Sequence, residues 1–319
     1  MSLIGSLVDY ELPQIFVRPA LNACRLFNTS LDSIFYDVPA LEQALLDHGD
    51  EIVTSDPGNA PTPKGEVNLS ADTDPEGSLL VIDPTTPPYV TAWRDVTAFI
   101  AHQKASADPI TVASITGVGS SALGSAALAW NVAIGLKKPV LAIVPGYGVA
   151  DVVLQGLGGW FGFGVYDLFQ TKSHLQNLLA VVAPKTAAIG RNLSASVPNP
   201  KKLNDAPAFR TGCGSSDVLH ALMEALKLDC VVGHSKGAMS ISNALHALPP
   251  GRTEGLKVVT LGCPIAEDLP ADYHQFLGLF DALGALNAWG HQPTKWVETG
   301  HSTNASLPFS MPAEELVTQ

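Results

Sequence analysis

The chain has 319 residues, of which 46% are hydrophobic and only 15% are charged, which excludes disorder over most of its length. This is enough apolar material for one large domain or two modest ones. With 18 basic and 30 acidic residues the formal net charge is −12. That balance argues against a nucleic-acid partner, because a general nucleic-acid binder needs a basic face.

The mean hydropathy of +0.19 raises the question of a membrane-spanning segment. The uncharged runs at 109–136 and 139–150 are both interrupted by glycine, and buried parallel strands produce similar runs. The N-terminus has no basic start followed by a cleavage site, and the 4 cysteines form no CxxC pair and no metal-ligand spacing. We therefore expect a cytoplasmic protein without a bound metal, and peripheral contact with a membrane stays open.

The first quarter of the chain is predicted to stand apart from the rest. Residues 12–48 carry apolar side chains at roughly helical spacing, and residues 54–77 are rich in turn-forming residues typical of a long surface loop. We therefore expect a helical N-terminal extension and loop over residues 1–78, followed by the main domain over residues 79–319.

From residue 79 onward, short apolar runs alternate with helical stretches. Strands are expected at 79–82, 110–115, 139–144, 230–232, 257–261, 276–279 and 295–298. Helices are expected at 92–104, 122–136, 217–226 and 237–248. This alternation predicts an α/β fold with a mostly parallel central sheet and helices on both of its faces.

One motif in this pattern is typical of a catalytic serine. The run Gly233-His234-Ser235-Lys236-Gly237 follows an apolar strand and precedes a helix. A strand, a sharp turn and a helix form the geometry that exposes a serine hydroxyl above a sheet. The two glycines suit a strained turn that neighbouring backbone approaches closely, and the helix N-terminus favours negative charge.

In this setting the sequence resembles the lipase and esterase branch of the α/β-hydrolase superfamily, over roughly residues 110–310. The resemblance implies a catalytic triad with Ser235 as the nucleophile. Members of the superfamily often place the catalytic histidine in a Gly-His pair after the last strand, and His301 matches that position. The acid lies between them in the chain, so Asp281 is the first candidate and Asp268 the second.

The resemblance also implies an oxyanion hole made of two backbone N–H donors. One donor is Lys236, the residue after the serine, whose side chain is not required for this role. The other is Val118, in a run at 116–119 that resembles the His-Gly-x-Gly loop of the family with threonine in place of histidine. The alternative second donor is Tyr147, which follows the next strand.

Residues 152–212 interrupt the alternation of strands and helices and coincide with the place where many lipases carry an inserted cap or lid. Ordinary core packing explains the aromatic and glycine-rich part of this segment equally well. The residues expected to line the substrate pocket are Gly117, His234, Trp160, Phe161 and Phe163.

The expected function is hydrolysis of hydrophobic carboxylic esters, small-molecule or lipid-like, through an acyl-enzyme and without a cofactor. An acyltransferase or thioesterase would use the same triad. A non-catalytic binding protein would have the same fold without catalytic activity. The run Gly117-x-Gly119-x-x-Ala122 also fits a dinucleotide-binding oxidoreductase. However, no acidic residue occurs between Asp108 and Asp151, and no Tyr-x-x-x-Lys exists in the chain.

Overall fold

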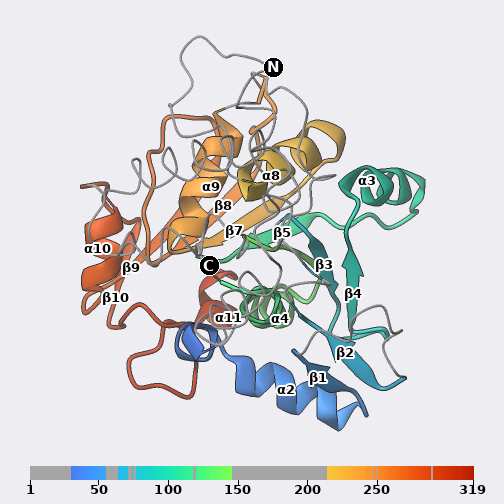
Figure 1. Cartoon of the computed structure of the whole chain (residues 1–319). Helices are drawn as coiled ribbons and strands as arrows, with labels where there is room; N and C mark the ends of the chain where they lie inside the picture. Colours follow the sequence, from blue (N-terminus) through green and yellow to red (C-terminus); the bar gives the residue numbers. More distant parts are fainter. Residues whose placement is uncertain are drawn as a thin grey trace, which may run out of the picture.

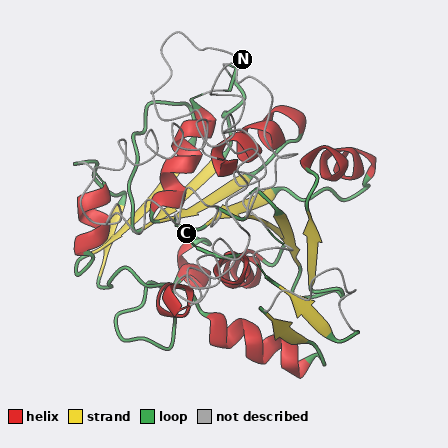
Figure 2. Cartoon of the chain, viewed as in Figure 1, coloured by secondary structure: helices red, strands yellow, loops and turns green. Residues whose placement is uncertain are grey.

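The computed structural model describes residues 30–54, 64–70, 74, 77–117, 120–145, 214–246, 248–249, 251–288 and 290–319. These residues form an α/β fold with one 8-stranded sheet, a separate 2-stranded sheet and helices packed on both sides (Figures 1 and 2). The predicted α/β class is thereby confirmed. Within the described part of the chain, no helix is both long enough and apolar enough to cross a membrane.

The large sheet is mixed but mostly parallel. Its strands are β3 (Leu79–Ile82), β4 (Val90–Trp93), β5 (Val112–Ile115), β6 (Val140–Ile143), β7 (Cys230–His234), β8 (Lys257–Leu261), β9 (Asp272–Gly278) and β10 (Lys295–Val297). Their spatial order is β10-β9-β8-β7-β5-β6-β3-β4. Strand β3 runs antiparallel to both of its neighbours, and all other neighbouring pairs in this sheet are parallel.

Helices cover the two faces of this sheet (Figure 1). One face carries α2 (Val38–Asp47), α4 (Ala122–Leu136) and α11 (Ala313–Leu316). The other carries α3 (Val96–Ala105), α8 (Gly214–Ala225) and α9 (Lys236–Leu245). Successive strand side chains point to opposite faces of the sheet. Leu80 therefore packs in the hydrophobic core beneath α2, α4 and α11, while Leu79 packs in the core beneath α3, α8 and α9.

Helix α4 has the longest unbroken run of buried residues in the described part of the chain. It carries no charged residue, and its buried positions run without a break from Ala122 to Ala133. A helix that is apolar on all sides requires cover on all sides, and the sheet, α2 and α11 supply that cover. The helix begins after Ser121, whose side chain accepts a hydrogen bond from the backbone N–H of Leu123.

The N-terminal region differs from the expectation in part. Residues 30–35 are helical, and α2 starts afresh after Asp37, whose side chain accepts from the N–H of Ala40. The interpretation of 54–77 as a loop is wrong at β2 (Glu66–Asn68), which pairs in parallel with β1 (Glu51–Val53). These strands have 3 residues each, too few to give an alternating pattern.

The predicted helix at 92–104 is also wrong at its beginning. Residues Val90–Trp93 form β4, an edge strand paired with β3. Helix α3 starts only at Val96, after Asp95, whose side chain accepts from the N–H of Thr97 and of Ala98. Aspartate is a strong N-cap residue, so the beginning of this helix could have been predicted from the sequence.

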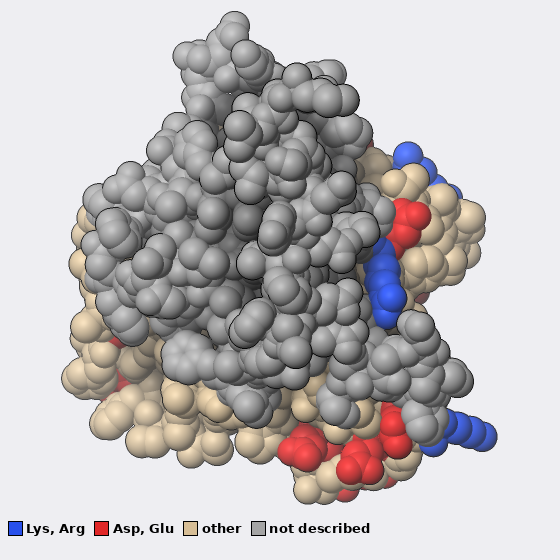
Figure 3. All heavy atoms as spheres, viewed as in Figure 1, with Lys and Arg blue, Asp and Glu red and all other residues tan. Residues whose placement is uncertain are grey.

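The described part of residues 1–78 packs on the main domain. Leu41 and Leu45 of α2 are fully buried in the same hydrophobic core as α4. Acidic side chains gather at the end of the face in Figure 3 where α2, β1 and β2 lie in Figure 1, while basic ones are scattered. The acidic residues within these three elements are Glu42, Asp47, Glu51 and Glu66.

The order of the strands marks where a ligand site is expected. After β5 the chain adds β6 on one side of it, and it later adds β7 on the other side. The carboxyl ends of β5 and β7 therefore form a topological switch point, where open α/β sheets bind their ligands. Gly117 follows β5, and Ser235 follows β7.

Candidate active site

Ser235 occupies a strained turn between β7 and α9. Its backbone dihedral angles are φ 53° and ψ −130°, a combination that costs a non-glycine residue on the order of 1–3 kcal/mol. The surroundings hold it there, since its N–H donates 2.8 Å to the carbonyl of Leu261 and its carbonyl accepts from the N–H of Ala238 at 3.1 Å. Strain of this kind clusters at functional sites.

The two glycines of the motif are required by close backbone packing. A Cβ at Gly237 would lie 2.2 Å from the carbonyl oxygen of Ile115 and 2.6 Å from that of Thr116. A Cβ at Gly233 would lie 2.6 Å from the Cα of Ala238. The prediction that neighbouring backbone approaches both positions closely is confirmed.

His301 and Asp281 form a buried pair. The Nδ1 atom of His301 lies 2.9 Å and 2.8 Å from the two carboxylate oxygens of Asp281, and Asp281 is only 2% exposed. The carboxylate also caps α10 (Ala282–Asn287) by accepting from the N–H of Gly284 at 2.6 Å. Because a carboxylate can only accept, Nδ1 carries the hydrogen, which leaves Nε2 free to accept a proton.

Of the two candidate acids, the structure brings Asp281 to His301 and holds Asp268 elsewhere. Asp268 accepts from the ring of His246 at 2.9 Å, and its side chain is 55% exposed. Sequence reasoning missed Gly262, which follows β8 and where a Cβ would lie 2.9 Å from Asp281 Oδ2 and 3.0 Å from His301 Nδ1. A glycine there leaves the space that the pair occupies.

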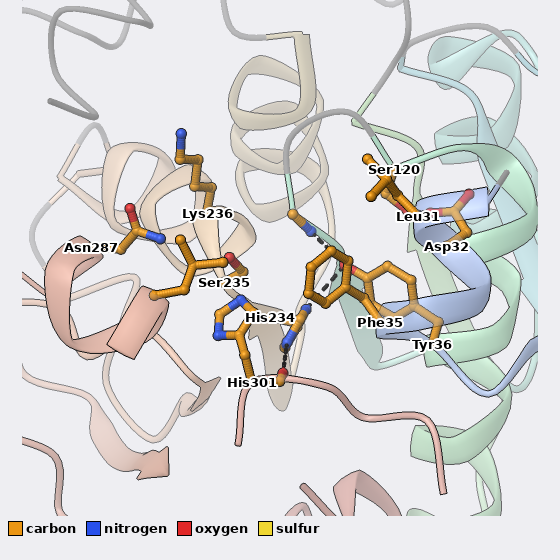
Figure 4. A pocket seen from close by; sticks show the side chains of 12 residues that line it. Leu31, Asp32, Phe35, Tyr36, Ser120, His234, Ser235, Lys236, Asn287 and His301 are labelled. Carbon is orange, nitrogen blue, oxygen red and sulfur yellow. Dashed lines mark hydrogen bonds between the residues drawn. The ribbon is translucent and has the colours of Figure 1, made fainter. Parts of the chain in front are cut away.

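Ser235 and His301 line the same cavity, and in Figure 4 the ring of His301 is turned toward the serine hydroxyl. The hydrogen bonds of the described residues do not include one between Ser235 Oγ and His301 Nε2. Such contacts are often long in enzymes without bound substrate and tighten when substrate binds.

The cavity has an empty volume of about 510 Å³ including its open mouth. It is lined by Leu31, Asp32, Phe35, Tyr36, Gly117, Ser120, His234, Ser235, Lys236, Leu283, Asn287 and His301. Gly117 and His234, which the sequence analysis assigned to the substrate pocket, both line this cavity. The contribution of residues 31–36 was missed, because nothing in their sequence marks them as more than part of a helical extension.

The N-terminus of α9 can supply one oxyanion donor. Lys236 is the first residue of α9, where helix N–H groups have no intrahelical partner, and its N–H makes no hydrogen bond within the described part of the chain. The positive end of the helix dipole adds to this preference for an anion. Burial lowers the pKa of the Lys236 ammonium, and no described carboxylate forms an ion pair with it.

Several predicted site residues lie outside the described residues. They are Val118, Tyr147, Trp160, Phe161 and Phe163, together with the whole of the proposed cap at 152–212. The N–H of Gly117, one residue before Val118, is already used, since it donates 2.9 Å to the hydroxyl of Tyr36.

His234 is held at both ring nitrogens. Its Nδ1 lies 3.0 Å from the Tyr36 hydroxyl and its Nε2 lies 2.9 Å from the backbone carbonyl oxygen of His301. Burial, and then the charge of His301, lower the pKa of His234 to about 3, so the ring is neutral at ordinary pH.

Asn287 presents a buried donor to the cavity. It lies at the end of α10 and is 7% exposed. Its amide nitrogen has no hydrogen-bond partner among the described residues. A buried donor without a partner costs roughly 1–3 kcal/mol, so a ligand oxygen that reached this nitrogen would relieve that cost.

The carboxylate of Asp32 binds the groups at the N-terminus of α4. Its carboxylate accepts from Ser120 Oγ at 2.8 Å and from both the N–H, at 3.0 Å, and the hydroxyl of Ser121. Burial raises the pKa of Asp32 to about 6, against the opposing effect of these hydrogen bonds. A dinucleotide places its pyrophosphate at such a helix N-terminus, so Asp32 disfavours the oxidoreductase interpretation.

Within the described ranges, no three His, Cys, Asp or Glu side chains are grouped so that they could hold a metal ion. Comparison with known proteins identifies no relative: no protein-family model, no curated protein and no solved structure matches this chain. Function must therefore be inferred from the residues of this chain and their geometry.

Proposed function

We propose that this chain is a serine hydrolase of the α/β-hydrolase type that cleaves carboxylic esters with an apolar acyl or alcohol part. One observation carries the proposal: Ser235 sits in a strained turn and shares a cavity with His301, whose Nδ1 is bonded to the buried Asp281. A serine hydroxyl is a weak nucleophile by itself, and it needs an adjacent base that a third group orients.

The reaction uses these groups in two steps. Ser235 Oγ attacks the ester carbonyl carbon while His301 Nε2 takes the hydroxyl proton, and the N–H of Lys236 donates to the oxyanion that forms. His301 then gives the proton to the leaving alcohol, which leaves an acyl-enzyme. Water, deprotonated by His301, attacks the acyl carbon, releases the acid and restores Ser235.

The lining of the cavity supports an apolar substrate. Leu31, Phe35 and Leu283 contribute aliphatic and aromatic surface beside the serine, and a site of this kind gains affinity mainly by burying apolar groups. This chemistry requires neither a metal ion nor an organic cofactor.

The test is hydrolysis of p-nitrophenyl esters from acetate to palmitate, combined with labelling by a fluorophosphonate. We expect wild type to turn over these esters and to be labelled on Ser235, and Ser235→Ala to lose both properties while remaining folded. The matched control is Ser106→Ala, in the loop after α3, which should keep both. A folded wild-type protein that neither turns over an ester nor takes the label would refute the proposal.

A further inference from the structure

We propose that Tyr36 and His234 are positioning residues that tie the end of β5 to the backbone of His301 and so set the place of the catalytic base. This inference rests on the proposed ester hydrolysis, since it assigns the two residues a role in that reaction. Neither residue contacts the reacting atoms in the mechanism above.

The connection is a continuous chain of hydrogen bonds (Figure 4). The N–H of Gly117 donates to the Tyr36 hydroxyl at 2.9 Å, and this hydroxyl lies 3.0 Å from His234 Nδ1. His234 Nε2 then lies 2.9 Å from the carbonyl oxygen of His301. The rings of Tyr36 and His234 also meet edge to face, with centroids 5.2 Å apart.

Each hydrogen bond in this chain can have only one direction. A backbone carbonyl only accepts, so Nε2 of His234 must carry the hydrogen. In the neutral ring Nδ1 is then an acceptor, so Tyr36 must donate to it. A backbone N–H only donates, so the Tyr36 oxygen accepts from Gly117.

The same reasoning excludes Tyr36 as an oxyanion donor. Its single hydroxyl hydrogen is given to His234, and none remains for a substrate oxygen. Burial raises the pKa of Tyr36 and lowers that of His234, so both stay neutral and the directions hold over the working pH range.

The chain joins parts of the site that lie far apart in the sequence. Its hydrogen bonds span 81, 198 and 67 residues of sequence. Asp281 fixes the ring of His301, and His234 fixes the backbone of that residue. Two anchors on one residue define its position. Displacing a catalytic group by about 1 Å greatly lowers the rate of the reaction.

The test compares Tyr36→Phe, His234→Leu and the double variant with wild type. We expect each single variant to lower kcat by roughly 10- to 100-fold with KM changed by less than about 3-fold. We expect the double variant to be no slower than the slower single one, because both changes interrupt one chain. The control is Tyr89→Phe, which stacks on His48 away from this cavity and should keep wild-type kinetics.

The variant His234→Gln separates positioning from simple packing. A glutamine amide can donate to the His301 carbonyl and accept from Tyr36, so it should restore kcat to within a few-fold of wild type, unlike leucine. Full kcat in Tyr36→Phe, additive losses in the double variant, or failure of glutamine to outperform leucine would each overturn the proposal.

A second measurement tests the hydrogen-bond chain without using activity. Nitrogen-15 NMR of the histidine rings should show His234 as the neutral Nε2–H tautomer throughout pH 5 to 8. A ring that carries its hydrogen on Nδ1, or that titrates in this range, would overturn the chain even in an active enzyme. The expected tautomer in a protein that cleaves no ester would instead place the failure in the proposed function.

Discussion

Ser302 Oγ donates a hydrogen bond of 2.6 Å to the backbone carbonyl of Ile34, across 268 residues of sequence. Beside it, both the N–H and the hydroxyl of Thr303 donate 2.8 Å to the carbonyl of Phe35. The last carbonyls of a helix have no intrahelical partner, and here the residues after His301 supply one. The loop that carries the candidate base is therefore braced by a segment from the beginning of the described chain.

Asn304 completes this brace and offers the first prediction. Its amide nitrogen donates 2.7 Å to the carbonyl of Ser33, and its amide oxygen accepts from the N–H and the hydroxyl of Ser306. Because Asn304 is 2% exposed, Asn304→Ala should lower the free energy of unfolding by about 2–4 kcal/mol. We also expect turnover per folded molecule to fall.

Urea unfolding and single-turnover kinetics would measure the two effects. The control is Gln292→Ala, which removes one exposed hydrogen bond of 3.3 Å to the carbonyl of Gly290 and should change stability by no more than about 0.5 kcal/mol. Equal stabilities of Asn304→Ala and wild type would contradict the bracing role.

The choice of Asp281 over Asp268 as the proposed catalytic acid gives the second prediction. Asp281→Asn should lower kcat by about 10³- to 10⁴-fold, because an amide no longer holds His301 in the tautomer with a free Nε2. Asp268→Asn is the matched control, since Asp268 is bonded to His246 and exposed, and it should keep kcat. The reverse ranking in an ester assay would remove Asp281 from the triad.

The third prediction concerns the glycine that lets α9 approach β5. Gly237→Ala would place a Cβ 2.2 Å from the carbonyl oxygen of Ile115, and backbone cannot easily retreat there. We expect a loss of at least about 3 kcal/mol of stability, or no folded protein. Gly255→Ala is the control, with φ 74° but open space around its Cβ, and should cost only about 1–2 kcal/mol. Similar thermal unfolding of both variants would show that close packing at Gly237 is unimportant.

The serine turn could be predicted from the sequence because its signals are local. Gly233, Ser235 and Gly237 lie within one strand–turn–helix unit, and the neighbouring apolar runs report the burial of β7 and α9. His301 and Asp281 were found from their order in the chain, through the resemblance to a known family.

The remainder of the site could not be predicted, because it depends on contacts between distant segments. Tyr36 and Asp32 reach the cavity only because residues 30–37 pack across the ends of β5 and β7, with hydrogen bonds spanning 81 to 198 residues. An aspartate in a helical stretch is usually a surface residue, and a tyrosine is intermediate in burial. Nothing in the local sequence distinguishes these two.

The fourth prediction uses two buried amides with atoms that lack partners among the described residues. Asn287 faces the cavity, whereas Asn243 lies fully buried within α9. Leucine at either position should raise the free energy of unfolding by about 1 kcal/mol, because a donor without a partner is removed. Only Asn287→Leu should lower kcat/KM, by roughly 10-fold. Unchanged kcat/KM in Asn287→Leu would show that its amide does not bind substrate.

The fifth prediction is a pH dependence of stability that originates at Asp32. Its pKa is raised from 3.8 to about 6 by burial, so between these values the folded protein holds a proton that the unfolded chain has released. Stability therefore falls as pH rises through this window, and the loss is complete above the folded pKa. A shift of this size corresponds to about 3 kcal/mol.

Asp32→Asn isolates this contribution, since it removes this ionisable carboxyl and leaves the rest of the sequence unchanged. Asparagine also loses hydrogen bonds, and this loss changes the difference in unfolding free energy between wild type and variant by an amount that does not depend on pH. The titration of Asp32 makes the same difference change with pH. We expect the stability of wild type relative to Asp32→Asn to fall by about 2 kcal/mol between pH 4 and pH 7 in urea unfolding. A flat difference would mean that Asp32 ionises as easily in the fold as in the unfolded chain. A rising one would mean that the hydroxyls of Ser120 and Ser121 stabilise its charge more than burial penalises it.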